Sequence, residues 1–339
     1  MSPHPRPTPP RARQRGFVLL LVLGLMTVSF LVVVGFSQLA RLELKWAARR
    51  QAHLTAYYLA RGAMAQAQFA LLAAWEQGLP FRLSADGSWQ EVETGRGRAA
   101  YAIQEEEGKL DLNRVGAVML ARGLARLGLR GRRLEELRDA IMDWRDPDGV
   151  PRARGAEEEY YRGLNPPYAP RNAAFLSPGE LTLVRGLDPG LVFGRLPLAP
   201  GAPTAAGCGL WSLFTIYARG RKVDLNQAPL AVLTCLPGLT PEIAAKLLRA
   251  RRRRPFRSFR RLRQVVGDSA FRLLAPWATL APGRIYTIVA RAEVDSPRAR
   301  HTILAVVYVT RRRLPRVLYW VDDVVQSPRP PAAVQGERR

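Results

Sequence analysis

The sequence is poor in cysteine and histidine, the residues that build many catalytic and metal sites. Among 339 residues there are two cysteines and three histidines. This scarcity excludes a disulfide-dense small scaffold and a four-thiolate zinc site, and it argues against a multi-histidine centre. His53 falls in a helical pattern and His301 at the start of a strand pattern, so no serine–histidine–aspartate arrangement is indicated. No glycine-rich phosphate loop is present, and we expect a protein that is not an enzyme.

Acidic residues are also scarce relative to basic ones. The chain has 52 Lys and Arg against 28 Asp and Glu, which gives a net charge of +24. Such an excess is typical of nucleic-acid-binding proteins, so this class has to be weighed. Apolar residues make up 47% of the chain, which is enough for a folded core. The length suggests two domains, or one domain with a large insertion.

The N-terminal region predicts a membrane anchor. Residues 1–15 contain four arginines and no acid, and an apolar run follows from Phe17 to Phe36. Twenty such residues in a helix span about 30 Å, the thickness of the hydrocarbon core of a bilayer. The arginines favour a cytoplasmic N-terminus, which places the rest of the chain beyond the inner membrane. Apolar residues continue at helical spacing without proline to residue 79, so one helix of about 55–60 residues is predicted.

The start of this helix resembles the signal of type IV pilins and pseudopilins. A basic leader and Gly16 precede Phe17, and in those families a prepilin peptidase cuts after the glycine and methylates the new N-terminus. Most members have glutamate at the fifth mature position, where this chain has Leu21. A carboxylate in lipid needs a partner, which in a fibre is the N-terminus of a neighbouring subunit. A subunit at the tip has no neighbour ahead of it, so Leu21 favours a tip position. An ordinary signal-anchor helix is the simpler alternative.

The remaining pattern predicts an α+β fold. We expect a pilin-like long N-terminal helix on a small antiparallel sheet, with a large all-α domain inserted between strands. Residues 78–96 are turn-rich, and strands are indicated at 98–107, 286–294, 302–311 and 316–323. The expected segments are a leader at 1–16, a membrane-spanning helix half at 17–37, pilin-like parts at 38–110 and 283–325, the inserted domain at 111–282 and a disordered tail at 326–339.

The inserted domain contains a repeated tripeptide and two features that point towards nucleic acid, a hairpin motif and an arginine-rich segment. The tripeptide Asp-Leu-Asn occurs at 111–113 and 224–226 before apolar helices, and is interpreted as two similar helix starts. After the second copy, residues 236–241 resemble a helix–hairpin–helix unit, although Thr240 replaces its second glycine. The arginine-rich segment 249–263 could contact phosphates or an acidic partner. A membrane-anchored DNA-binding protein of competence type is therefore an alternative.

Two further groups of residues are candidate sites. Carboxylates cluster at Asp143, Asp146 and Asp148 and again at 157–159. Oxygen ligands on irregular backbone suit calcium, but a solvated acidic loop balanced by nearby arginines explains the pattern equally well. Cys208 and Cys235 could form a disulfide outside the cytoplasm, or they could be two unrelated thiols.

Taken together, the chain resembles the minor pseudopilin K family of type II secretion (general secretion pathway protein K). The resemblance rests on the segments 16–25, 139–149, 155–187 and 223–248 and covers roughly residues 16–325. It implies a role at the tip of the periplasmic pseudopilus, in initiating its assembly and supporting secretion across the outer membrane. A minor pilin of a type IV pilus is a further alternative.

The resemblance also implies location, partners and a metal. It implies a single-pass inner-membrane protein with its bulk in the periplasm, methylated at the mature N-terminus. The implied partners are minor pseudopilins I and J, other pseudopilins, the inner-membrane platform and prepilin peptidase, whereas nucleic acid is not expected. Calcium is the family's metal, and by position its ligands here are Asp146, Asp148, Glu157 and Glu158. Removing the leader would take four arginines away and leave a mature charge of +20, from +24 minus 4.

Overall fold

The computed structural model describes residues 14–78, 83, 85–194, 209–218, 220–310 and 313–322. In chain order the helices and strands are α1 (Gln14–Glu76), β1 (Asp86–Val92), β2 (Arg98–Glu105), η3 (Glu106–Gly108), β3 (Leu110–Asp111), α2 (Ala117–Arg126), α3 (Gly131–Arg145), α4 (Glu158–Arg162), η4 (Pro178–Leu183), α5 (Pro189–Phe193), η5 (Leu210–Ser212), β4 (Phe214–Thr215), β5 (Val223–Asp224), α6 (Leu230–Leu233), α7 (Pro241–Arg253), α8 (Phe259–Val266), α9 (Asp268–Leu274), η6 (Ala275–Trp277), β6 (Ala278–Thr279), β7 (Ile285–Asp295), β8 (Arg298–Thr310) and β9 (Arg313–Asp322).

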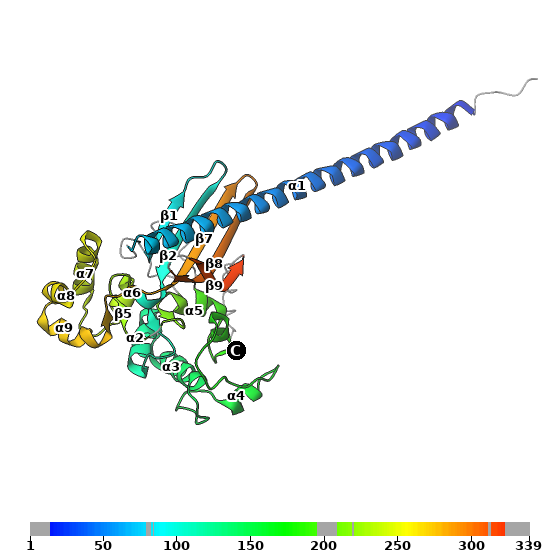
Figure 1. Ribbon diagram of the computed structural model, residues 1–339. Coiled ribbons are helices and arrows are strands. Elements are labelled where there is room, and N and C mark those ends of the chain that lie inside the picture. Colours follow the sequence, from blue (N-terminus) through cyan, green and yellow to red (C-terminus); the bar gives the residue numbers. More distant parts are fainter. Residues whose placement is uncertain are drawn as a thin grey trace, which may run out of the picture.

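Helix α1 has two halves with different environments. Its first half projects from the rest of the molecule (Figure 1), and the described side chains from Val18 to Leu39 are all exposed although most are apolar. This half is long and apolar enough to cross a membrane. The second half packs on the sheet, and buried residues recur there at helical spacing: Ala52, Ala56, Ala60, Ala63, Met64, Ala67, Leu71 and Trp75. The small alanines let the helix backbone lie close to the strands.

The sheet has five antiparallel strands in the order β1-β2-β7-β8-β9. Strands β2 and β7 are neighbours, and their register runs from Arg98 opposite Glu293 to Glu105 opposite Tyr286. The whole helical region therefore lies between two adjacent strands of one sheet. This arrangement confirms the predicted α+β fold with a helical domain inserted between strands. The domain is not all-α, however, because it also contains the short parallel strand pairs β3–β4 and β5–β6.

The two faces of the sheet bury different partners. Ile103, Tyr286 and Val307 belong to the apolar cluster under α1, whereas Val289 and Leu304 belong to the core of the helical domain. Since neighbouring side chains of a strand point to opposite faces, β7 and β8 carry apolar residues at nearly every position. The helical domain thus covers the face of the sheet that is turned away from α1 (Figure 1).

The sheet differs from the sequence expectation at its two edges. Strand β1 was not expected, because Asp86–Val92 lies in the turn-rich segment 78–96 and contains Gly87 and Ser88. Strand β9 begins at Arg313 and includes Pro315, which was expected to precede it. Proline lacks a backbone donor and is accepted at an edge, where one side of the strand needs no partner. Most of the leader and the tail 326–339 lie outside the described residues.

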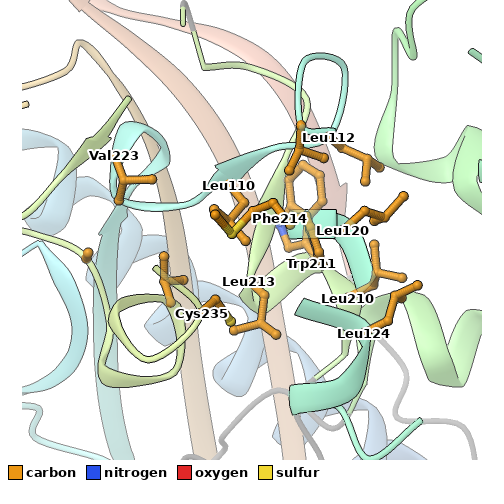
Figure 2. Packing of buried hydrophobic residues seen from close by; sticks show 14 of the residues in the cluster. Leu110, Leu112, Leu120, Leu124, Leu210, Trp211, Leu213, Phe214, Val223 and Cys235 are labelled. Carbon is orange, nitrogen blue, oxygen red and sulfur yellow. The ribbon is translucent and has the colours of Figure 1, made fainter. Parts of the chain in front are cut away.

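The core of the helical domain forms around aromatic side chains. Figure 2 shows Phe214 and Trp211 beside Leu110, Leu120 and Leu124, which come from β3 and α2. Gly123 on α2 makes this packing possible, because a Cβ atom there would lie 2.3 Å from the Phe214 ring. The bulky ring therefore fills the space that a larger helical residue would occupy.

The repeated tripeptide builds the same arrangement twice. Asn113 donates to the Phe175 carbonyl over 3.1 Å and accepts from its N–H over 2.8 Å, and Asn226 does the same with Phe256 over 3.0 and 2.8 Å. Neither helix is capped by the tripeptide, because the N-cap positions of α2 and α6 are Gly116 and Pro229. The tripeptide instead holds a distant loop through its asparagine.

An arginine completes each arrangement. Arg145, at the end of α3, donates to the carbonyls of Leu112 and Val115. Arg251, near the end of α7, donates to the carbonyls of Leu225 and Ala228 over 2.9 and 2.7 Å. We call these the first clasp (Asn113, Arg145, Phe175) and the second clasp (Asn226, Arg251, Phe256). The helical domain therefore contains two units of the same design, beyond the two similar helix starts that the sequence indicated.

A buried ion pair joins the helical domain to the sheet. Lys109 Nζ lies 2.6 Å from a Glu106 carboxylate oxygen, and both side chains are fully buried. Glu106 also accepts hydrogen bonds from Thr215 of β4 and Thr287 of β7. Lys109 lies 4.9 Å from the centre of the Trp211 ring, a favourable position for a cation. The pair is thus satisfied from the sheet and from the inserted domain together.

Removing one member of this pair should destabilise the protein strongly. We expect Lys109→Met to lower the free energy of unfolding by about 3–5 kcal/mol, because it leaves the Glu106 carboxylate buried without a counter-charge. The matched control is Arg132→Met, which breaks the exposed Arg132–Glu136 pair and should cost about 0.5 kcal/mol or less. Denaturant unfolding of the full chain in detergent measures both values, and equal effects would contradict the prediction.

Candidate functional site

Three of the four predicted metal ligands meet beyond the end of α3. Oxygens of Asp146, Asp148 and Glu157 all lie within 4.8 Å of one another. Asp146 directly follows α3, and Glu157 directly precedes α4, so the intervening loop returns on itself. Glu158 does not join them, because it is half exposed and pairs with Arg162 one turn later in α4. The structure therefore groups Asp146, Asp148 and Glu157 and separates Glu158 from them.

Glu157 is the most constrained of these carboxylates. It is 5% exposed, and no hydrogen bond of normal geometry reaches either of its carboxylate oxygens from the described residues. Burial, together with the negative charges of Asp143 and Asp146, raises the pKa of Glu157 to about 7, while Asn172 opposes the shift. Oxygen Oδ1 of Asp146 is likewise buried without a donor. Buried oxygens without donors fit a site for a cation.

Asn172 is a site residue that the sequence did not single out. Its backbone φ is +48°, and its amide nitrogen donates to the Asp148 carbonyl over 3.2 Å. Its Oδ1 atom is buried and has no donor among the residues that the structure describes. Asparagine is tolerated in the left-handed region, and a carbonyl oxygen is a suitable calcium ligand. A lone asparagine in an irregular stretch gives no periodic signal by which it could be found.

Asp143 holds the loop between α3 and α4 in place and is not a member of the acidic group. It is completely buried and accepts hydrogen bonds from the backbone N–H groups of Arg152 and Ala156 over 3.1 and 2.9 Å. The Arg152 guanidinium lies 2.5 Å from both Asp143 and Asp146. Gly155 passes so close that a Cβ atom there would lie 1.6 Å from an Asp143 oxygen. Asp143 thus fixes the turn that brings Glu157 back to Asp146.

The basic segment 249–263 is divided between structural and exposed arginines. Arg251 belongs to the second clasp, Arg261 donates to the carbonyl of Pro255 over 3.1 Å, and Arg263 forms an ion pair with Asp268 at 2.5 Å. Five others are exposed and have no ion-pair partner within the described parts of the chain: Arg249, Arg252, Arg253, Arg254 and Arg260. The segment therefore presents fewer free cations than its composition suggests.

The hairpin before α7 is closed by its own side chains. Gly238 has a φ of +80°, and a Cβ atom there would lie 2.6 Å from the Ala270 carbonyl. Thr240 caps α7 by accepting from the Ile243 N–H over 3.4 Å. Glu242 follows in the first turn, and a hydrogen bond from Thr240 lowers its pKa. A helix N-terminus that binds phosphate offers free backbone N–H groups. The N-terminus of α7 instead carries the Thr240 hydroxyl and the Glu242 carboxylate, which disfavours phosphate binding there.

The two cysteines are not both described. Cys235 is buried just after α6, and burial raises the pKa of its thiol to about 11. Its sulfur lies 3.2 Å from the Ala231 carbonyl. Cys208 lies outside the described residues, so the disulfide between Cys208 and Cys235 stays a prediction. Gly16 and Phe17 lie in the first turn of α1, and cleavage between them also stays a prediction.

The fold by itself defines a class of protein. A long helix with one apolar exposed half, packed by its other half on an antiparallel sheet, is a pilin-like architecture with an N-terminal anchor. The family model for "Type II secretion system (T2SS), protein K" matches residues 102–198, and that for the helix-hairpin-helix motif matches residues 219–279. These matches support an assignment of the chain to the protein K family of type II secretion systems.

Similar proteins support this assignment. Type II secretion system protein K of Pectobacterium carotovorum subsp. carotovorum is 30% identical over 216 residues, which cover 58% of this chain and 65% of that protein. The protein K of Aeromonas hydrophila is 26% identical over 216 residues, with 57% and 65% covered. The matched regions thus cover just under two thirds of the length of these relatives. A chain in the crystal structure of the GspK-GspI-GspJ complex from enterotoxigenic Escherichia coli shares the fold, with a TM-score of 0.53, 14% identity and coverage of 78% and 96%.

Proposed function

We propose that this chain is a minor pseudopilin at the tip of a type II secretion pseudopilus, where it initiates assembly and supports secretion across the outer membrane. One observation carries the proposal. A pilin-like helix and sheet carry a wide helical domain between β2 and β7, on the side away from the exposed half of α1 (Figure 1). A domain of this width leaves no room for another subunit to stack above by the same helical symmetry.

The exposed half of α1 anchors the subunit before assembly. Its apolar side chains need lipid, or sister helices once the subunit has left the membrane. The leader arginines keep the N-terminus in the cytoplasm, so the sheet and the helical domain lie in the periplasm. Leu21, which is exposed, brings no carboxylate into the bilayer and therefore needs no subunit ahead of it.

The partners are those of a fibre tip. The structural neighbour was crystallised in a GspK-GspI-GspJ complex, which supports minor pseudopilins I and J as partners of this chain. Other pseudopilins would follow below the tip, the inner-membrane platform would receive the first subunits, and prepilin peptidase would process the leader. DNA binding is disfavoured, because Thr240 and Glu242 close the N-terminus of α7. A minor pilin of a type IV pilus remains the second candidate, and the family match favours secretion.

Processing of the leader tests the pilin class. We expect the mature chain to begin with N-methylated Phe17, because the Gly16–Phe17 junction has the form that prepilin peptidase cuts. Mass spectrometry of the membrane-extracted protein measures this. Gly16→Val should abolish cleavage, whereas the control Gly35→Val, at an exposed position of α1 with open space around it, should leave it intact. An unprocessed Met1 in the wild type would contradict the class.

Assembly tests the position at the tip. In a strain that lacks this gene, we expect pseudopili and secretion to be lost, and the full chain to restore both. A chain without residues 112–280 should not restore them, because the helical domain forms the cap. Immunoblotting of membranes checks that the shortened chain persists, and capture by a tagged full chain measures binding of I and J. Normal fibres with the shortened chain, or no capture of I and J, would contradict the proposal.

Calcium in the acidic group forms part of this proposal. Asp146, Asp148 and Glu157 would hold the ion, with Asn172 Oδ1 as an additional oxygen. The ion would neutralise carboxylates that repel one another and supply partners for the buried oxygens. Its role would be structural, since it would lock the loop between α3 and α4.

Calcium binding should stabilise the full chain. At a hundredfold excess over Kd, we expect calcium to add about 2.7 kcal/mol to the free energy of unfolding. Glu157→Gln should remove most of this gain, because its carboxylate is the buried one. The matched control is Glu158→Gln, which should keep the gain, since Glu158 pairs with Arg162. Unfolding with calcium or chelator, and metal analysis of the purified protein, measure both effects, and an unchanged stability would contradict a calcium site.

A further inference from the structure

A cavity of about 370 Å³ lies between the sheet and the helical domain. Strands β1, β2, β7 and β8 form one wall, and α5, η5, α6 and α7 form the other. Most of its lining is apolar, including Trp89, Val289, Leu304, Phe193, Trp211 and Leu248. We call this the interlayer cavity. It is distinct from the acidic group, since Asp146, Asp148 and Glu157 do not line it.

Two polar groups of the interlayer cavity lack partners. The indole N–H groups of Trp89 and Trp211 are both buried and have no acceptor among the described residues. Trp211 as a whole is 4% exposed. A buried donor left without an acceptor costs about 1–3 kcal/mol. Trp89 and Trp211 lie on opposite walls of one cavity, so an acceptor that entered it and reached these donors would relieve this cost.

Three other polar side chains on these walls are already satisfied. Arg251 donates to two carbonyls in the second clasp and lies 3.6 Å from Asp86. Ser212 donates to the Gly209 carbonyl over 2.7 Å, and Thr287 donates to Glu106 over 2.6 Å. The unpaired donors are therefore confined to particular side chains, as in binding sites where a few polar groups fix the orientation of an apolar ligand.

The charge around the interlayer cavity favours an anion. Arg251 and Asp86 offset each other, whereas Arg252 is exposed and has no ion-pair partner in the described parts of the chain. The lining therefore carries one surplus positive charge next to two neutral donors. A cavity of this volume is within the range of ligand pockets, about 300–1,000 Å³, and is far larger than a single water requires.

We propose that the interlayer cavity binds an apolar carboxylate. The apolar part would lie between Trp89 and Trp211, and the carboxylate oxygens would accept from the indole N–H groups and pair with Arg252. Two sources share this chemistry, namely a free aromatic or aliphatic acid and the C-terminal residue of a peptide. The inference does not depend on a tip position, because it rests on the lining residues alone.

Calorimetric titration of the full chain in zwitterionic lipid nanodiscs tests the proposal. The probes are 4-phenylbutyrate, its uncharged amide, and N-acetyl-Leu-Phe with a free C-terminus. We expect the acid to bind about tenfold more tightly than the amide, because charge-assisted hydrogen bonds are roughly twice as strong as neutral ones. Tighter binding of N-acetyl-Leu-Phe than of 4-phenylbutyrate would assign the source as a peptide end, and the reverse order would assign it as a free acid.

Variants locate the binding. Arg252→Gln should weaken binding of the acid about two- to fivefold, whereas Arg253→Gln, its exposed neighbour outside the cavity, should leave it unchanged. Ala231→Phe, which adds bulk at the cavity wall, should abolish binding, and the thermal unfolding temperature checks that each variant is folded. No binding of either acid at millimolar concentration would overturn the proposal and leave water as the occupant. Binding that persists in folded Ala231→Phe would overturn it as well.

Discussion

The pairing of β2 with β7 is the constraint on which the rest of the structure depends. It joins residues 98–105 to residues 286–293, with the helical region between them. Both ends of the inserted domain therefore leave from adjacent strands, at the same end of the sheet. Glu106 follows β2 directly and meets Thr287 of β7, so the buried ion pair with Lys109 forms where the two parts of the molecule join. A change at this junction acts on the sheet and on the inserted domain at once.

The two clasps show how one design supports two different surfaces. In each, an arginine near the end of a helix holds the turn of an Asp-Leu-Asn tripeptide. The residue after Arg145 is Asp146, which opens the acidic group, and the residue after Arg251 is Arg252, which borders the interlayer cavity. The clasp fixes the backbone, and the residue that follows sets the charge. The helical domain thus presents an acidic loop from its first unit and a basic residue at the cavity wall from its second.

Much of the fold could be predicted from the sequence, because its strongest signals are periodic. The long helix, the three final strands and the insertion between strands follow from apolar spacing and β-branched runs. Strand β1 could not be found, since Gly87 and Ser88 read as a turn and its pairing with β2 is set by tertiary context. In the acidic group, the family resemblance implied three residues that meet, but it could not show that Glu158 turns to Arg162 or that Asn172 approaches across a loop. The unpaired indoles of Trp89 and Trp211 line one cavity although they are far apart in sequence. No local sequence pattern indicates that the two residues share a cavity.

The continuity of α1 has a mechanical consequence. The helix runs from Gln14 to Glu76 without a break, and its second half is fixed to the sheet by the buried alanines. A helix rises about 1.5 Å per residue, so moving its apolar half out of a bilayer by twenty residues displaces the sheet and the helical domain by about 30 Å. The protein has no proline in this rod that would absorb the motion. Force applied at the membrane end therefore reaches the far end of the molecule as translation rather than as bending.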